Sequence, residues 1–185
     1  MLKKLLIAVA ILTSMVSFGQ EVNFGVQGGY INMEGKSSNS LDDVSSSGNS
    51  SGFYLGALVD FTLSDNFHLQ PSVNYANADD VNFIIVPVLA QYYIQDSGFY
   101  LQAGPQGTFL LDNVSLEGID LLNTFGLDLA FGAGYKITSN FFVEAKYSFE
   151  LTNRFSKEVK DAADSEGIEV DSQFNAFSIG LGYKF

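Results

Sequence analysis

Beyond Gln20, apolar and polar residues alternate along the chain with a period of two, which is the period of a β-strand. Eight segments carry this alternation, and a strand is predicted over each of them: residues 22–30, 53–63, 67–75, 83–94, 99–109, 125–137, 141–151 and 177–185. The predicted fold class is therefore all-β.

The predicted connections are alternately short and long. The short ones, at residues 64–66, 95–98 and 138–140, are polar and typical of hairpin turns. The long ones cover residues 34–52, 76–82, 111–124 and 152–173, and most of the first is a flexible, Ser- and Asn-rich loop of low complexity. This arrangement predicts an eight-stranded antiparallel up-and-down transmembrane β-barrel of the bacterial outer membrane, with both termini at the short-turn, periplasmic end.

One phase of the alternation carries no charged residue in any of the predicted strands. Since Lys or Arg on the lipid face at the bilayer midplane costs about 2–4 kcal/mol, this phase is predicted to face lipid. Its members from the second strand onward are Phe53, Leu55, Val59, Phe61, Leu63, Phe67, Leu69, Val73, Tyr75, Ile84, Val86, Val88, Tyr92, Phe99, Leu101, Phe109, Phe125, Leu127, Leu129, Phe131, Tyr135, Phe141, Val143, Tyr147, Phe149, Phe177, Ile179, Leu181, Tyr183 and Phe185.

The opposite phase is predicted to line a polar lumen. Its ionisable members form a predicted lumen network of Asp60, His68, Asp128, Lys136, Glu144, Lys146, Glu150 and Lys184. Side chains just fill the interior of an eight-stranded barrel, and buried charges are costly unless paired, so we expect ion pairs and a plugged lumen. Glu144 and Lys146 are expected beside Gly132 and Gly134, with Lys136 within diagonal reach of Glu144. A gate or proton path is the alternative reading of the same cluster.

Periodicity alone cannot tell inside from outside, so a soluble barrel of lipocalin type, apolar inside, is the alternative fold. The polar phase is rich in Gly and poor in Lys and Glu, which makes an unsuitable solvated surface. The sequence therefore favours the membrane barrel.

Residues 1–19 have the features of a signal peptide. Lys3 and Lys4 precede an apolar run, and small residues precede a cleavage site before Gln20. A membrane anchor is the alternative, but the apolar run is shorter than the roughly 20 residues that span a bilayer. The barrel domain is thus predicted over residues 20–185.

Composition narrows the function. The chain has no Cys, which excludes disulfides and thiol chemistry, and its formal net charge of −12 argues against nucleic acid as a partner. Cleavage would leave 21 acidic and 7 basic residues, or −14. Many of the acids fall in the long connections: Asp42, Asp43, Asp79, Asp80, Asp112, Glu117 and Asp120. The last connection mixes Arg154, Lys157 and Lys160 with further acids.

An acidic rim could bridge divalent cations to lipopolysaccharide phosphates, since hard cations prefer oxygen ligands. A solvated rim explains the same residues, and we expect no bound metal or cofactor.

Several motifs resemble those of the PorT-like, porin-family β-barrels of Bacteroidota. They are Leu69-Gln70-Pro71, Ile85-Val86-Pro87-Val88-Leu89, Ala103-Gly104-Pro105, Gly132-Ala133-Gly134-Tyr135-Lys136, Gly180-Leu181-Gly182-Tyr183-Lys184-Phe185 and the Ser17-Phe18-Gly19-Gln20 junction. The resemblance covers the mature chain and implies a small eight-stranded outer-membrane barrel, without implying an activity. The resemblance also implies that the prolines lie within strands and do not end them, although each removes a ladder hydrogen bond.

The final strand ends on alternating apolar residues and a terminal Phe, which resembles the signal read by the barrel-assembly machinery. Its members are Phe177, Ile179, Leu181, Tyr183 and Phe185.

The predicted function is a structural or surface-interaction role through the extracellular loops of a monomeric, non-enzymatic outer-membrane protein. Outer-membrane lipid and lipopolysaccharide are its expected surroundings. The alternatives are a narrow channel for ions or very small solutes and a surface hydrolase. The hydrolase is disfavoured because His68, the only histidine, lies near a short turn and about 13 Å along the strand from Ser72.

Overall fold

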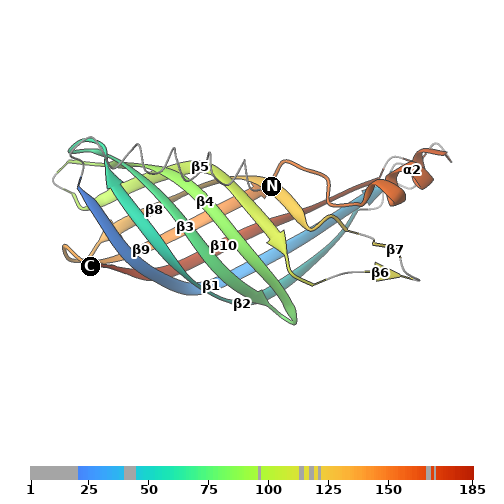
Figure 1. Ribbon diagram of the computed structural model, residues 1–185, viewed down its shortest axis with the longest axis horizontal. Coiled ribbons are helices and arrows are strands. Elements are labelled where there is room, and N and C mark those ends of the chain that lie inside the picture. The colour runs from blue at the N-terminus through green and yellow to red at the C-terminus, as the bar shows by residue number, and fades with distance from the viewer. Residues whose placement is uncertain are drawn as a thin grey trace, which may run out of the picture.

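The chain forms a closed antiparallel barrel of eight long strands in the computed structural model, in the order β1-β10-β9-β8-β5-β4-β3-β2 (Figure 1). The strands are β1 (Val22–Asn39), β2 (Ser45–Thr62), β3 (Phe67–Ala78), β4 (Val81–Tyr93), β5 (Phe99–Leu110), β8 (Phe125–Lys136), β9 (Phe141–Glu150) and β10 (Val170–Lys184). The structure describes residues 21–39, 45–95, 97–112, 115–116, 119–120, 122–165, 168 and 170–185. The predicted signal peptide lies outside these residues, as do Asp42, Asp43 and Glu117.

The two ends of the barrel differ. At one end, called the tight-turn end, neighbouring strands are joined by the three predicted short connections, closed by bonds such as Leu63 N–H to Phe67 O and Ile137 N–H to Phe141 O. The first residue of β1 and the last residues of β10 lie at this end, since Val22 pairs with Phe61 and Lys184 with Gly25. The other, long-connection end carries α2 (Lys157–Ser165) and the small hairpin of β6 (Ser115–Leu116) and β7 (Ile119–Asp120) (Figure 1).

The predicted loop over residues 34–52 is wrong for its described residues. The β1–β2 pairing continues to Ser38 opposite Ser45, and the β1–β10 pairing to Asn39 opposite Val170. Backbone groups make these ladders, so they can continue where the side chains no longer alternate. The extended ends of β1, β2 and β10 form a three-stranded sheet that projects from the long-connection end (Figure 1). We call it the projecting sheet.

The other long connections also contain more structure than predicted. The predicted loop over residues 76–82 is a two-residue turn at Asp79 and Asp80, with Asp79 at a φ of 42°, a left-handed conformation that Asp tolerates. Residues 111–124 include β6 and β7, and residues 152–173 include α2 and the start of β10. Within the described residues, no helix is long and apolar enough to cross a membrane.

The outer surface of the barrel is apolar. Alternate large side chains of each strand are exposed, as with Leu55 at 64%, Leu101 at 55% and Leu181 at 58%. Phe61, between Val22 and Leu69 of the neighbouring strands, is the exception on this phase and is buried. The polar phase faces inward, so the lipocalin-type alternative is wrong.

Outward-facing aromatic side chains form two rows near the ends of the barrel. Near the tight turns the pairs are Phe67–Tyr92, Phe99–Tyr135 and Phe141–Tyr183, with ring centroids 5.0, 4.6 and 4.8 Å apart. Towards the other end the pairs are Phe53–Tyr75 and Phe109–Phe125, at 6.4 and 5.1 Å. With the usual strand rise and tilt the rows are about 20–25 Å apart, close to the height of the apolar band of an outer-membrane barrel.

The three strand prolines lie in adjacent strands and at neighbouring levels, because Pro71 pairs with Val88 and Pro87 with Gln106. Each proline keeps its pairing to the following strand and interrupts the pairing to the preceding one. The interruptions fall at 59–60 against 70–71, 72–73 against 86–87, and 88–89 against 104–105. Since the lost pairing is confined to one side of each proline, the barrel still closes.

Candidate functional site

The interior of the barrel is the candidate site, because charged, histidine and tyrosine side chains from seven of its strands converge there. Near the tight-turn end, Asp60 of β2 lies between two partners. Its Oδ1 is 2.9 Å from Nδ1 of His68, and its Oδ2 accepts a hydrogen bond from Nζ of Lys184 at 2.5 Å. All three side chains are buried. The ring of His68 also lies 4.4 Å from that of Tyr93, centroid to centroid.

A second group surrounds Glu144 of β9, which is buried in the middle of the barrel. Its Oε1 accepts from Nζ of Lys146 at 2.5 Å, and its Oε2 accepts from Gln102 at 3.1 Å and from the Tyr100 hydroxyl at 3.3 Å. The register is the predicted one, with Glu144 opposite Gly134 and Lys146 opposite Gly132.

Buried amides link these two groups into one network. Gln91 donates to Oε1 of both Gln70 and Gln102, each at 3.0 Å, and accepts from the Tyr93 hydroxyl at 3.2 Å. The same hydroxyl accepts from Lys184 at 3.4 Å. Hydrogen bonds therefore cross the lumen without a break from Asp60 to Glu144.

Lys136 does not lie against Glu144 as an ion-pair partner. Its Nζ lies 4.2 Å from the centroid of the Tyr93 ring, a cation–π contact. The side chain of Lys136 is half-buried at the tight-turn end, whereas Lys146 occupies the position beside Glu144.

Asp128 of β8 lies closer to the long-connection end. Its Oδ2 accepts from the Thr108 hydroxyl and from Gln106 at 3.1 Å, and Gln106 also donates to Ser148 at 3.1 Å. Its Oδ1 has no hydrogen-bond partner among the described residues. Asp128 is held by neutral donors rather than by an adjacent cation.

Arg154 corrects the sequence analysis, which placed it with the exposed charges of the last connection. It is fully buried, and its Nε donates to Oε1 of Glu150 at 2.5 Å. Its other nitrogens donate to the carbonyl oxygens of Thr108 at 3.2 Å and Thr124 at 3.1 Å. Glu150 also accepts from the Phe174 N–H at 2.7 Å. Arg154 thus ties the last connection to three strand ends.

Glycines provide the space that these large side chains occupy. A Cβ at Gly134 would lie 2.1 Å from the Tyr100 ring, and one at Gly126 would lie 1.9 Å from Oε1 of Glu150. Both separations are impossible for real atoms, so a side chain at either position would displace a member of the network.

The lumen is not polar throughout, which is a second correction. Towards the long-connection end its lining becomes a buried apolar layer that the sequence analysis did not predict. The members are Ile31, Met33, Tyr54, Ala76, Ala78, Phe83, Ile85, Leu110 and Ala176, with Val81, Leu122 and Phe174 packed against them.

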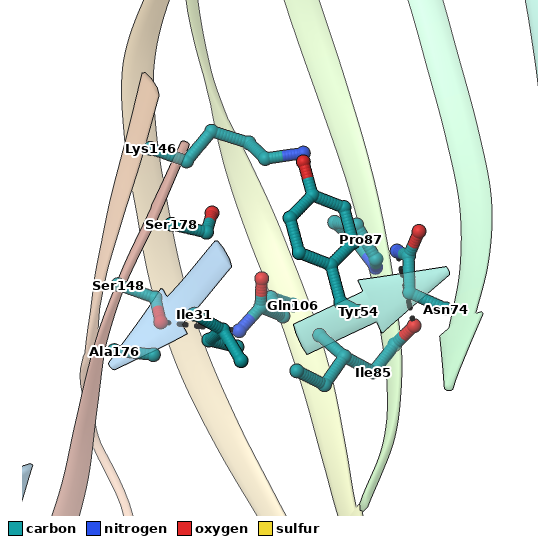
Figure 2. Close-up of a pocket in the computed structure, with 10 residues that line it drawn as sticks. All are labelled: Ile31, Tyr54, Asn74, Ile85, Pro87, Gln106, Lys146, Ser148, Ala176 and Ser178. Carbon is teal, nitrogen blue, oxygen red and sulfur yellow. Dashed lines mark hydrogen bonds between the residues drawn. The ribbon is translucent and has the colours of Figure 1, made fainter. Parts of the chain in front are cut away.

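Between the polar and apolar levels lies a cavity of about 30 Å³, close to the volume of one water molecule in the liquid. Tyr54, Asn74, Gln106 and Lys146 are among the side chains around it (Figure 2). The Tyr54 hydroxyl, which points towards Lys146 in Figure 2, has no hydrogen-bond partner in the described part of the chain.

His68 and Ser72 do not form a catalytic pair. Besides Asp60, His68 Nδ1 contacts the Thr62 hydroxyl at 3.5 Å, whereas the Ser72 hydroxyl accepts from Gln27 and Asn74. Among the described residues, no group of three or more His, Asp or Glu side chains is placed to hold a metal ion. The predicted assembly-signal residues Phe177, Ile179, Leu181 and Phe185 are exposed on the outside of the barrel, and Tyr183 is half-buried there.

A family model described as "Outer membrane protein beta-barrel domain" matches residues 80–156. Among solved structures, the chain is similar to Neisserial surface protein A, with 18% identity, a TM-score of 0.53, and coverage of 89% of this chain and 99% of that one. The fold is that of an outer-membrane β-barrel. Together with the apolar outer surface, these findings support an outer-membrane location.

Two further similar structures have lower TM-scores. OprG from Pseudomonas aeruginosa is 15% identical, covers 90% of this chain and 97% of that one, and gives 0.48. Ail, the attachment invasion locus protein of Yersinia pestis, is 15% identical, covers 89% and 99%, and gives 0.49. No curated protein matches the sequence significantly.

Proposed function

We propose that the chain is a monomeric, PorT-like outer-membrane protein with a plugged lumen, and that its projecting sheet binds an extended segment of a surface partner. In this proposal the signal peptide is removed, both termini are periplasmic, and the outward residues of β10 are read by the assembly machinery. The loops lie among lipopolysaccharide and outside the cell.

The observation that carries the proposal is an open edge on the projecting sheet, where no described strand pairs with the outer side of residues 45–50. Residues 45–50 of β2 pair with β1 on one side, whereas pairing with β3 starts only at Gly52 opposite Ala78. The opposite margin of the sheet is covered. There Arg154 N–H donates to Ser172 O at 2.7 Å, and Asn153 donates to Val170 O at 2.8 Å.

An open edge offers backbone donors and acceptors to another strand. Exposed edges are usually protected by charged residues or proline, and residues 45–50 contain neither. Strand addition uses this geometry: main-chain hydrogen bonds give affinity, and neighbouring pockets select side chains. The edge therefore fits an extended peptide segment as its partner.

The edge can be blocked at one residue. Ser51 O accepts from Asp79 N–H on the side of β3, and alternate residues of a strand point their backbone groups the same way. Asn49 N–H therefore points to the open side, and Asn49→Pro removes that donor without removing one from the β1–β2 ladder. Asn49→Ala keeps the donor and is the matched control.

The test selects peptides from a random linear library on the barrel embedded in lipid nanodiscs. Selected peptides should bind the wild type and Asn49→Ala and lose binding to Asn49→Pro. Equal binding to Asn49→Pro, or no peptide enriched over empty nanodiscs, would contradict the proposed strand addition.

The filled interior supports a closed lumen rather than a channel. We expect no conductance steps from the barrel in planar bilayers, because the networks around Asp60, Glu144 and Glu150 occupy three successive levels of the lumen. Reproducible steps that change in Glu144→Gln or Lys146→Met would instead support the narrow channel for ions or very small solutes.

A non-enzymatic role is part of the proposal. His68 lies at the tight-turn end and bonds to Asp60, far from the projecting sheet where a surface substrate would arrive. Its proposed role is structural, as a hydrogen-bonding member of the lumen network.

A further inference from the structure

A cavity of about 280 Å³ lies at the mouth of the barrel, inside the base of the projecting sheet. It is separate from the ionic network and lies against the apolar layer. The side chains that enclose it are mainly Met33, Ala78, Val81, Phe83, Leu110, Leu122 and Phe174, and Gly35, Gly48, Asn49 and Ser50 complete its wall.

The lining identifies the kind of molecule that fits. Among the described residues, no charged side chain lines the cavity, and the nearby Arg154 already bonds to Glu150 and to backbone carbonyls. Ordered water needs several polar partners, and polar side chains are confined to Asn49 and Ser50 among the described lining residues, whereas protein interiors are normally close-packed. An apolar occupant would therefore be favoured over water or an ion.

Two features of the wall favour an aromatic occupant. The rings of Phe83 and Phe174 meet edge to face, with centroids 6.2 Å apart, and Met33 is also a lining residue. Further rings add well to such edges, and sulfur contacts aromatic rings favourably. An engineered apolar cavity of about 150 Å³ binds benzene, so a larger cavity has room for one or two rings.

We propose that this cavity is a binding site for a neutral aromatic molecule of one or two rings. The site does not depend on the strand addition proposed above. It provides a small-molecule site at the outer mouth of a barrel whose lumen is closed below it.

Met33 provides a direct reporter. The chain has three methionines, and the other two, Met1 and Met15, lie in the predicted signal peptide. In protein carrying ¹³C-labelled methionine methyl groups in nanodiscs, the Met33 signal is assigned by its loss in Met33→Leu. Titration with indole should shift this signal in a saturable way, because a bound ring changes the field at the neighbouring methyl group.

Gly48 allows the cavity to be filled. A Cβ at this position would meet no described atom within 4 Å, and Gly48 lines the cavity, so Gly48→Leu is designed to extend a side chain into it. Ser47→Leu is the matched control, because Ser47 lines a polar groove on the other face of the same strand. The saturable shift should persist in Ser47→Leu and be lost in Gly48→Leu. If Gly48→Leu fails to show the heat-modifiable gel mobility of a folded barrel, Ser50→Leu takes its place.

Three results would overturn the proposal. The first is a Met33 shift that rises linearly without saturation, which indicates partition into lipid only. The second is an unchanged response in the filled variant. The third is saturable binding of octane but not of indole, which would assign the cavity to aliphatic chains.

Discussion

At the scale of single residues, the contact between Arg154 and Glu150 offers the strongest test of whether buried ion pairs in the lumen stabilise the barrel. Arg154→Met would leave the buried Glu150 carboxylate, among the described residues, with only the Phe174 N–H at 2.7 Å and the Thr152 hydroxyl at 3.0 Å as donors. Removing one partner of a buried ion pair costs about 3–5 kcal/mol, so we expect a loss of that size in the free energy of unfolding. Urea unfolding in lipid vesicles measures it, with gel mobility as the readout because the chain has no Trp.

Lys36→Met is the control for this substitution. Lys36 lies 3.1 Å from Glu34 on the projecting sheet, and its side chain is 50% exposed. An exposed pair contributes about 0–1 kcal/mol, so this variant should unfold like the wild type. Equal losses of unfolding free energy in the two variants would show that the buried contact between Arg154 and Glu150 does not stabilise the barrel. Replacing Glu150 by Met together with Arg154 should recover part of the loss, since no unpaired carboxylate remains.

One feature of the sequence does point to the special role of Arg154, although the alternation of apolar and polar residues gives no information about it. It is the only arginine in the chain, whose other bases are lysines, and a planar guanidinium suits several fixed acceptors at once. Its position after the last inward residue of β9 made it look like a loop charge. Its burial depends on Gly126 of the adjacent strand leaving the space open, and this relation appears only after the strands are paired.

At the scale of elements, the strands were predictable where side chains alternate between lipid and lumen. All eight were located, and the register of β8 against β9 followed from a short turn. The projecting sheet was not predictable in this way. Both faces of β1 and β2 lie outside lipid there, so the bilayer no longer requires alternation and only the backbone ladder remains.

The apolar layer was missed for a related reason. Met33 and Leu110 lie beyond the ends of their predicted strands, so no phase was assigned to them, and Phe83 lies on the phase that was predicted to line a polar lumen. Once the strands are extended, all three point inward and are buried. The alternation therefore could not predict the cavity that we propose as a binding site, because the cavity lies at positions beyond the lipid-facing part of the strands.

A glycine illustrates how the elements fit together. Gly134→Ala would bring a Cβ within 2.1 Å of the Tyr100 ring, which itself contacts Glu144. We expect this variant to lose about 1–3 kcal/mol of unfolding free energy, the usual cost of overpacking a core. Gly48→Ala is the control, because its Cβ would meet nothing within 4 Å. A Gly134→Ala barrel as stable as Gly48→Ala would mean that the middle of the lumen is not closely packed.

At the scale of the whole molecule, charge and apolar surface are divided by position. The lumen holds four acidic and four basic side chains near one another, so the excess of acids in the chain lies in its connections and at the ends of the barrel. The aromatic rows leave an apolar belt between these regions. Such a molecule is stable only with the belt in lipid, and the two ends must then face different compartments.

The proposed orientation places the projecting sheet outside the cell and the tight turns in the periplasm, as in other outer-membrane barrels. The absence of native cysteine permits a clean test with single-cysteine variants. Ser47→Cys on the projecting sheet should react with a membrane-impermeant maleimide on intact cells. Ser139→Cys, in the turn between β8 and β9, should react only after the outer membrane is permeabilised. Both positions are exposed, so a difference in labelling reports the membrane barrier rather than burial. The reverse pattern would invert the barrel and place the open edge of β2 in the periplasm, where any partner would be an envelope protein rather than an external one.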